Sequence, residues 1–379
     1  MAVAALCACG RVGFIESAAG DAVVDDAAVT NWSRVFAGDQ TTCGVFQGRG
    51  YCWGRGTNRE IGDGGSVNRA SPAAIAVPPG TVTQIAQGEG HGCAIVDDAA
   101  YCWGNAPPGT GVPASAMPVA VTMLPTPVTS ISAGEEHTCA VAAGAVYCWG
   151  VEQVGCLGNG AAGSSMTPVL VALPTTAVAV DSGNDHTMAL LVDDSVSVWG
   201  HNDSGTFGTG SFTPNSSDVP VASAATKRLP SLGGWHACTL VADATYCWGQ
   251  GTMGELGNGL STNSASPVAV PSLGANVTSV VANGGPMDFD ASCAIVGGAV
   301  RCWGNGLFGR LGQGTTNNEP TPVAVEGLPS DIVEIALGYD HACARSADGT
   351  LRCWGRGDSG QLGDGASVSS LTPVIVPTP

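Results

Sequence analysis

A Trp-Gly pair recurs seven times along the 379-residue chain, and this repeat constrains the fold more than any other feature. The pairs follow one another at intervals of 46 to 55 residues, beginning at Trp53, Trp103, Trp149, Trp199, Trp248, Trp303 and Trp354. Seven units of about 50 residues need about 350 positions, and residues 29–379 supply 351. The sequence therefore predicts a single domain over residues 29–379, preceded by a short N-terminal segment and linker of residues 1–28.

Each unit consists of short apolar runs separated by turn residues. In the last unit these runs are residues 333–338, 339–343, 353–355 and 372–376, and each apolar run is bounded by Gly, Asp, Asn or Pro. Runs of this length and setting are typical of β-strands, and no segment shows a long apolar period of 3.6 residues. The hydrophobic content of 44%, with only 12% charged residues, argues against disorder. We expect an all-β repeat with three or four strands in each unit.

The net charge of −18 restricts the class of partner. A strongly acidic protein repels phosphate backbones, so we expect no binding to nucleic acid. A protein with a basic surface is the natural complement.

Cysteines recur in pairs, nine or ten positions apart, in six of the seven units. If the two cysteines face each other across an antiparallel hairpin, the loop between the strands has two residues, or three in the last unit. Turn residues such as Gly48 and Gly144 suit loops of this length. Such cysteines occupy a non-hydrogen-bonded pair, where the Cα atoms lie about 4.5 Å apart, within disulfide range. The predicted disulfides are Cys43–Cys52, Cys93–Cys102, Cys139–Cys148, Cys238–Cys247, Cys293–Cys302 and Cys343–Cys353.

The fourth unit is an internal control for this pairing, because Met188 and Val198 replace both of its cysteines together. Two alternatives remain open: reduced cysteines that pack as small hydrophobes, and zinc sites, for which one His and two Cys per unit give too few ligands. Disulfides imply an oxidising compartment. We therefore expect a secreted or cell-envelope protein.

The N-terminal residues Leu6-Cys7-Ala8-Cys9 resemble the end of a bacterial lipoprotein signal, with Cys9 as the lipidation candidate. The apolar stretch before them is short for export, and an ordinary frayed terminus is the alternative. No other segment is long and apolar enough to span a membrane. Any membrane attachment would therefore depend on the lipid anchor.

Three motifs, G-x-x-H-x-C-A, C-W-G and G-x-L-G-x-G followed by T-P-V-x-V, resemble the regulator of chromosome condensation repeat family, in the cysteine-bearing form of exported bacterial proteins. The resemblance covers the chain from about residue 29 onward and implies a seven-bladed β-propeller. In such a ring, the Trp of Trp-Gly and the Leu of L-G-x-G should be buried between blades. Two units depart from the pattern: residues 107–111 replace the glycine motif of the second, and the sixth lacks the His and has an insertion around residues 285–290.

The family resemblance does not determine function. The eponymous member is a guanine-nucleotide exchange factor for a small GTPase, but predicted export and the acidic charge count against that activity here. A secreted bacterial propeller that clasps and inhibits β-lactamases matches compartment and architecture better. We favour a non-enzymatic, extracytoplasmic protein-binding or scaffold propeller, with nucleotide exchange and an enzyme with an unrecognised pocket as alternatives.

Catalytic and metal-binding readings are weak. Residues 357–360, GDSG, resemble a serine-hydrolase loop, but other units carry unrelated residues at the same repeat position. His91, His137, His186, His236 and His341 also share one repeat position, which favours structural hydrogen bonds over a common metal ion. No calcium or phosphate-binding loop occurs. We therefore expect no catalytic residues, no metal and no cofactor.

One set of loops looks suited to binding. These loops lie between the glycine that ends the first strand and the His position, so repeat symmetry places them on one face. They are acidic and carry three aromatic residues, which suits a protein interface with a basic partner. The alternative is that the acidic residues only maintain solubility. The partner-binding candidates are Trp235, Phe289, Tyr339, Glu135, Glu136, Asp185, Asp288, Asp290 and Asp340.

Overall fold

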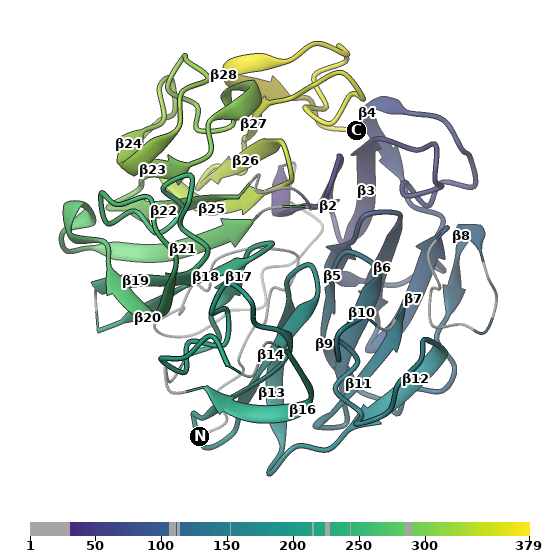
Figure 1. Cartoon of the computed structure of the whole chain (residues 1–379). Coiled ribbons are helices and arrows are strands. Elements are labelled where there is room, and N and C mark those ends of the chain that lie inside the picture. The colour runs from purple at the N-terminus through teal and green to yellow at the C-terminus, as the bar shows by residue number, and fades with distance from the viewer. Residues whose placement is uncertain are drawn as a thin grey trace.

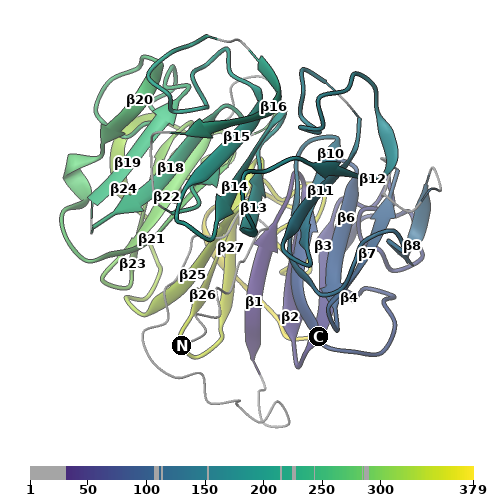
Figure 2. The same cartoon turned by 90° about the horizontal axis from the view of Figure 1, so that it is seen from below.

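The protein is a ring of seven four-stranded antiparallel sheets, which confirms the predicted seven-bladed propeller (Figure 1). The computed structural model describes residues 31–105, 111, 114–151, 153–213, 216–223, 228–242, 244–283, 285 and 290–379. Figure 2 shows the blades from the side, with their strands running between the two faces of the ring.

Each blade consists of four strands that are consecutive in sequence and neighbours in the sheet. Blades one to three comprise β1 (Trp32–Ala37), β2 (Thr41–Phe46), β3 (Arg49–Gly54), β4 (Arg69–Ala74); β5 (Val82–Gln87), β6 (His91–Val96), β7 (Ala99–Gly104), β8 (Ser115–Ala120); and β9 (Val128–Ala133), β10 (His137–Ala142), β11 (Ala145–Gly150), β12 (Ser165–Val171). Blades four and five comprise β13 (Ala177–Ser182), β14 (His186–Leu191), β15 (Val196–His201), β16 (Ser216–Ser223); and β17 (Ser231–Leu232), β18 (His236–Val241), β19 (Ala244–Gly249), β20 (Ser264–Ala269). Blades six and seven comprise β21 (Val277–Asn283), β22 (Ala291–Val296), β23 (Ala299–Gly304), β24 (Glu319–Ala324); and β25 (Ile332–Leu337), β26 (His341–Ser346), β27 (Leu351–Gly355), β28 (Ser370–Val376).

Helical structure in the described residues is limited to two short 3₁₀ segments, η2 (Pro271–Leu273) and η3 (Leu307–Gly309). Neither they nor any other helix in these ranges could cross a lipid bilayer.

The hairpins between second and third strands have the predicted geometry. Gln47 and Gly48, at φ angles of 51° and 72°, occupy the left-handed conformation that a two-residue hairpin loop requires. All six predicted cysteine pairs are disulfide-bonded, with Cα atoms 4.0 to 4.1 Å apart. In blade four, Met188 lies directly opposite Val198, at the register position that cysteines occupy elsewhere.

The tryptophans of the Trp-Gly pairs are buried between blades, as the repeat predicts. Six of the indole N–H groups donate to a backbone carbonyl of the preceding blade. The accepting residue lies two positions before the motif glycine, which follows Leu in four blades, Ile61 in blade one and Phe207 in blade four. The pairs are Trp53 to Gln361, Trp103 to Glu60, Trp199 to Cys156, Trp248 to Thr206, Trp303 to Glu255 and Trp354 to Arg310. The motif glycines lie against the indole rings. A β-carbon on Gly158 would lie 2.6 Å from the ring of Trp199, so a larger residue there would push neighbouring blades apart.

The outermost strand of every blade contains a proline: Pro72, Pro118, Pro168, Pro220, Pro267, Pro322 and Pro373. Because proline has no N–H to donate, it blocks further strand pairing at these seven sheet edges.

Candidate functional site

The loops between the first and second strands meet around the axis on one side of the ring. Backbone hydrogen bonds link them from blade to blade: Glu89 donates to Glu135, Glu135 to Asn184, and Tyr339 to Asp39, at 3.1, 3.3 and 3.1 Å. The residue after each Trp-Gly pair joins the same surface, since its N–H donates to the adjacent loop, as Arg55 does to Gln40. We call this surface the loop face.

Histidines at the shared repeat position connect neighbouring blades beneath the loop face. Their Nε2 atoms lie 2.7 to 2.8 Å from a hydroxyl of the next blade, in the pairs His91–Thr138, His137–Thr187, His236–Ser292 and His341–Thr42. Ala237 takes the place of the hydroxyl after His186. Burial lowers the pKa of His91 to about 4 and those of His137 and His341 to about 3, so these imidazoles are neutral at pH 7. Their positions fit the predicted structural role.

One of these contacts has the geometry of a catalytic triad. His236 Nε2 lies 2.8 Å from Ser292 Oγ, and His236 Nδ1 lies 2.9 Å from Asp290 Oδ2. All three side chains are fully buried, and Ser292 occupies the position that Thr42, Thr138 and Thr187 take in other blades. A nucleophile needs access to its substrate. The arrangement therefore acts as an interblade link.

Positive charges on the loop face come from blades six, seven and one, where carboxylates or backbone carbonyls accept hydrogen bonds from the buried and half-buried arginines. Arg356 contacts Asp340 at 2.9 Å and Asp358 at 2.8 Å, and Arg55 contacts Asp39 at 2.7 Å. Arg310 is buried and donates to the carbonyl of Tyr339 at 2.6 Å. These three arginines therefore all have partners within the chain.

Blades two to four contribute carboxylates but no arginine or lysine to the loop face, although Arg55 and Arg59 of blade one reach its blade-two edge. The chain has no Lys or Arg from residue 70 to residue 226. We call Glu89, Glu135, Glu136 and Asp185 the acidic arc. Partial burial, and then the charges of Asp185 and Glu89, raise the pKa of Glu135 to about 7. Glu89, at one end of the arc, also lies close enough to Arg55 to affect the pKa of that guanidinium.

The predicted aromatic residues divide between the two halves. Trp235 is half-buried and contacts the ring of His201 edge to face, with centroids 5.0 Å apart. Tyr339 packs against Gly285, where a β-carbon would lie 1.9 Å from its ring; burial and the nearby Asp340 raise its phenol pKa.

The remaining candidates are distributed as follows. Asp290 and Asp340 are buried, so both hold the loops from within, whereas Glu135, Glu136 and Asp185 reach the surface. Burial raises the pKa of Asp340, with Arg310 and Arg356 opposing the shift. Asp288, Phe289 and the lipidation candidate Cys9 lie outside the described residues.

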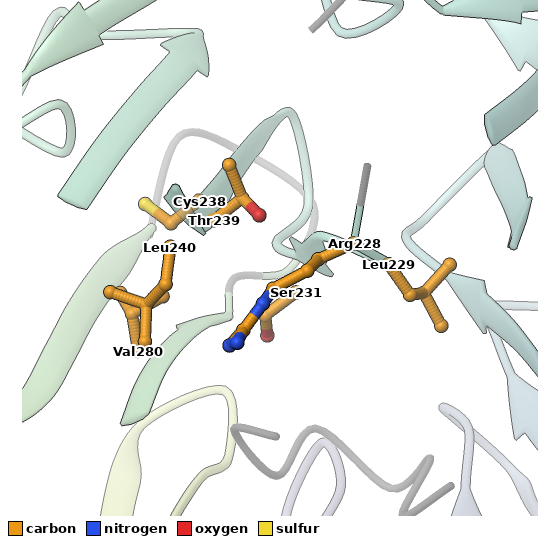
Figure 3. A pocket seen from close by; sticks show the side chains of 7 residues that line it. All are labelled: Arg228, Leu229, Ser231, Cys238, Thr239, Leu240 and Val280. Atoms are coloured by element: carbon orange, nitrogen blue, oxygen red, sulfur yellow. The ribbon is translucent and has the colours of Figure 1, made fainter. Parts of the chain in front are cut away.

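A small cavity lies between blades five and six. It is lined by side chains that include Arg228, Ser231 and Val280 (Figure 3), and its volume of about 20 Å³ accommodates one water molecule. It lies beside β17, which has only two residues. Among the described residues, no three His, Cys, Asp or Glu side chains are placed to share a metal ion.

Sequence reasoning missed the interblade His–hydroxyl pairs and the charge division of the loop face. The sequence contains a signal for each. For four of the five histidines, the next blade has Thr or Ser directly after its own His position. Residues 70–226 contain no Lys or Arg, which marks the acidic half of the loop face. Each His position has to be compared with the same repeat position of the next blade before the contact between blades can be recognised.

A closed ring of seven four-stranded blades is the architecture of the repeat β-propellers. Models of the regulator of chromosome condensation (RCC1) repeat match residues 47–95, 143–190, 177–206, 243–285, 297–345 and 332–361. The chain belongs to this repeat family.

Similar solved structures cover most of this chain and support its fold, but at about 20% identity they do not determine its function. The ultraviolet-B receptor UVR8 of Arabidopsis thaliana is 41% identical over 75 residues, 20% of this chain and 17% of the receptor. The structure of human WBSCR16 superimposes with a TM-score of 0.75 at 20% identity, covering 87% of this chain and 94% of that one. Prp20p of Saccharomyces cerevisiae, described with its binding to Gsp1p and histones, gives 0.72 at 19% identity, with coverage of 86% and 85%.

Proposed function

We propose that this chain is a non-enzymatic, extracytoplasmic propeller that binds a protein partner through its loop face. The observation that carries the proposal is the acidic arc, which lies in a stretch of the chain without Lys or Arg from residue 70 to residue 226. Carboxylates gathered on one half of a ring attract a partner of opposite charge and orient it. The partner surface is therefore basic.

The compartment follows from the disulfides. Six disulfides point to an oxidising, extracellular environment. We extend this to secretion or attachment to a bacterial cell envelope, with Cys9 as the lipid-bearing residue. Acylation of Cys9 is testable by mass spectrometry of the protein from its native membrane.

Two features support binding over catalysis. The triad-like residues Ser292, His236 and Asp290 are inaccessible to substrate, and the cavity beside Ser231 holds only one water molecule. The loop face is an extended charged surface, which suits binding of a protein better than catalysis on a small molecule.

Nucleotide exchange on a small GTPase is the second candidate, because Prp20p, described with its binding to Gsp1p, shares the fold. Histones, also named for Prp20p, are basic proteins, and this agrees with an acidic binding surface. Release of fluorescent guanine nucleotide from a GTPase of the source cell would distinguish exchange from simple binding.

The test is affinity capture from the native cell envelope with matched charge-neutral variants. Glu136→Gln with Asp185→Asn removes two charges from the acidic arc. Asp98→Asn with Asp194→Asn removes two from hairpin turns on the opposite side, where Asn tolerates the positive φ angles of 64° and 65°. We expect only the first variant to lose the partner, and equal capture by both variants would refute the proposal.

A further inference from the structure

Glu255 is a buried carboxyl group in the loop between β19 and β20 of blade five. It lies seven residues after Trp248, at the repeat position whose backbone carbonyl accepts the indole N–H of the next blade. The side chain is fully buried, and within the described ranges its Oε1 atom has no hydrogen-bond partner. An ionised carboxylate is unstable in such a place, because burial removes the water that would otherwise solvate its charge.

Blade one has the same residue at this repeat position and pairs it with an arginine. Glu60 and Glu255 both accept, through Oε2, the backbone N–H of the residue two positions earlier, at 2.8 Å. The other oxygen of Glu60 contacts Arg55 Nε at 2.6 Å. Gln250 stands at the position of Arg55 in blade five, so the acid of blade five has no basic counterpart there.

Blade seven shows that this position also accepts a side chain without charge. Gln361 lies seven residues after Trp354, and its Oε1 atom accepts the backbone N–H of Ser359 at 3.0 Å, as the glutamates do through Oε2. The Nε2 atom is buried and has no hydrogen-bond partner among the described residues. A protonated Glu255 has nearly the same shape and, like glutamine, no charge. Its environment therefore suits the protonated form.

Three titratable or charged groups from neighbouring elements act on the Glu255 carboxyl: His236 at the start of β18, Asp290 directly before β22, and Arg310 directly after η3. Burial, and then the charge of Asp290, raises the pKa of Glu255 to about 7, whereas His236 and backbone hydrogen bonds lower it. Arg310 donates to the carbonyl of Tyr339 at 2.6 Å instead of to the Glu255 carboxyl.

The backbone of Glu255 joins blade five to blade six. Its carbonyl accepts Trp303 Nε1 at 2.7 Å and Ser292 Oγ at 3.1 Å. The Ser292 hydroxyl in turn lies 2.8 Å from Nε2 of His236. If the loop moved to bring the Glu255 carboxyl to water, these contacts between the two blades would be lost.

We propose that Glu255 is a proton-operated latch on the seam between blades five and six. While the carboxyl keeps its proton, the loop of residues 250–256 stays packed in the seam, as the Gln361 loop does in blade seven. When the proton passes to water, the carboxylate has no arginine partner, and the loop turns outward to hydrate the charge. The latch belongs to this chain alone and needs no partner protein.

The direction of the pH effect follows from the two states of the loop. In the open loop the Glu255 carboxyl is solvated and has its ordinary pKa of 4.5, whereas the packed carboxyl binds its proton more tightly, with a pKa of about 7. Between pH 4.5 and pH 7 the open population therefore rises about tenfold with each pH unit, and above pH 7 it levels off. The stabilisation of the seam by Glu255 is fully present below pH 4.5 and is lost as the pH rises through 7.

Hydrogen–deuterium exchange at pH 5 and pH 8 tests the latch, with rates expressed as protection factors so that the intrinsic pH dependence of exchange cancels. The packed loop contains hydrogen-bonded backbone N–H groups at Met253, Gly254 and Gly257. We expect their protection to fall by at least about 10-fold from pH 5 to pH 8. The corresponding loop of blade one, residues 58–62, should change by less than about 3-fold in the same sample, because an arginine already pairs with its glutamate. Unchanged protection in blade five, or equal losses in the two loops, would overturn the latch.

Three variants assign the effect to Glu255. Glu255→Gln carries the side chain of blade seven and removes only the titration, so it should fold and keep its protection at pH 8 within about 3-fold of the pH 5 value. Gln250→Arg supplies the arginine of blade one and should likewise abolish the fall while Glu255 is retained. Glu326→Gln makes the same change at an exposed glutamate after β24 and is the matched control, in which the fall should remain. A fall of wild-type size in Glu255→Gln, or in a folded Gln250→Arg variant, would assign the effect to another group and overturn the latch.

Discussion

Trp53 of the first blade donates its indole N–H to the backbone carbonyl of Gln361 in the last blade, at 3.0 Å, across 308 residues of sequence. This bond closes the ring by the same contact that joins other neighbouring blades. No strand is exchanged between the chain ends among the described residues, because β1 begins blade one and β28 completes blade seven. A salt bridge between Arg34 and Glu334, at 3.1 Å, adds to the closure.

Gly363 should be essential to this closure, whereas Gly365 should not. A β-carbon on Gly363 would lie 2.5 Å from Trp53 Nε1, while one on Gly365 would have its nearest neighbour at 3.7 Å. Both residues have positive φ angles, 74° and 88°, so the conformational cost of alanine is similar at the two sites. We expect Gly363→Ala to lower the free energy of unfolding by about 2–3 kcal/mol more than Gly365→Ala, because of overpacking. Urea denaturation of both variants measures the difference, and equal losses would contradict the closure argument.

Blade four should accept a seventh disulfide. Met188 and Val198 face each other at the cysteine register, and their ten-residue separation equals that of Cys343 and Cys353. A bridge closing a loop of this size contributes about 2–3 kcal/mol on the chain-entropy model, reduced by the lost packing of Met188. We expect Met188→Cys with Val198→Cys to form the bond and raise stability by about 1–2 kcal/mol.

Mass spectrometry under non-reducing conditions and thermal unfolding would check the added disulfide. Each single cysteine variant serves as a control for the packing change and should be less stable than the wild type. Persistent free thiols in the double variant would show that the blade-four hairpin has a different geometry.

The global fold could be predicted from the sequence because its determinants are local and repeated. The number of Trp-Gly pairs gives the number of blades. The nine-residue separation of Cys43 and Cys52 implies a two-residue loop, and a loop of that length fixes which residues pair across the hairpin. Unit two lacks the glycine motif of the other units. Trp149, which faces that blade, has no indole hydrogen-bond partner among the described residues.

The candidate site was predictable only in part, because side-chain burial depends on neighbours from other blades. Asp340 and Asp185 share a repeat position, yet Asp340 is buried by its ion pair with Arg356 while Asp185 reaches the surface. Likewise, Asp290 follows an insertion, and its contact with His236 crosses a blade boundary. Sequence position places such residues on the loop face, but only packing decides which of them a partner can contact.

Acidification should destabilise the protein through its interblade histidines. Histidine in the unfolded chain has a pKa near 6.5, whereas burial lowers that of folded His91 to about 4. Below pH 6.5 the unfolded state binds a proton that the folded state does not, so the contribution of His91 to stability is present above pH 6.5 and declines until about pH 4. The loss amounts to about 1.4 kcal/mol per pH unit, or about 3 kcal/mol in total.

A comparison of the wild type with His91→Gln isolates this effect from other titrating groups. Burial raises the pKa of Glu255 to about 7, so the folded carboxyl binds its proton more tightly than the unfolded one. As the pH falls from 7 to 4.5, Glu255 therefore increases the free energy of unfolding, which opposes the effect of His91. That contribution cancels in the comparison. Glutamine can still donate to Thr138 but does not titrate. Chemical denaturation at pH 7.5 and pH 4.5 should show a smaller loss for the variant, and identical pH dependence would exclude a buried neutral His91.

Ser292 should tolerate threonine but not alanine, although it completes a triad-like geometry with His236 and Asp290. Its hydroxyl lies 2.8 Å from His236 Nε2 and also 3.1 Å from the carbonyl of Glu255. Thr42 and Thr138 occupy the equivalent position in other blades, so Ser292→Thr keeps both hydrogen bonds and should change stability by less than about 1 kcal/mol. Ser292→Ala leaves buried polar atoms unpaired and should cost about 1–3 kcal/mol. Thermal unfolding distinguishes these outcomes.

A separate experiment tests whether Ser292 is reactive. A fluorophosphonate probe, which labels activated serines, should leave the folded wild type unmodified. Specific labelling at Ser292 would establish a reactive nucleophile and overturn the purely structural assignment.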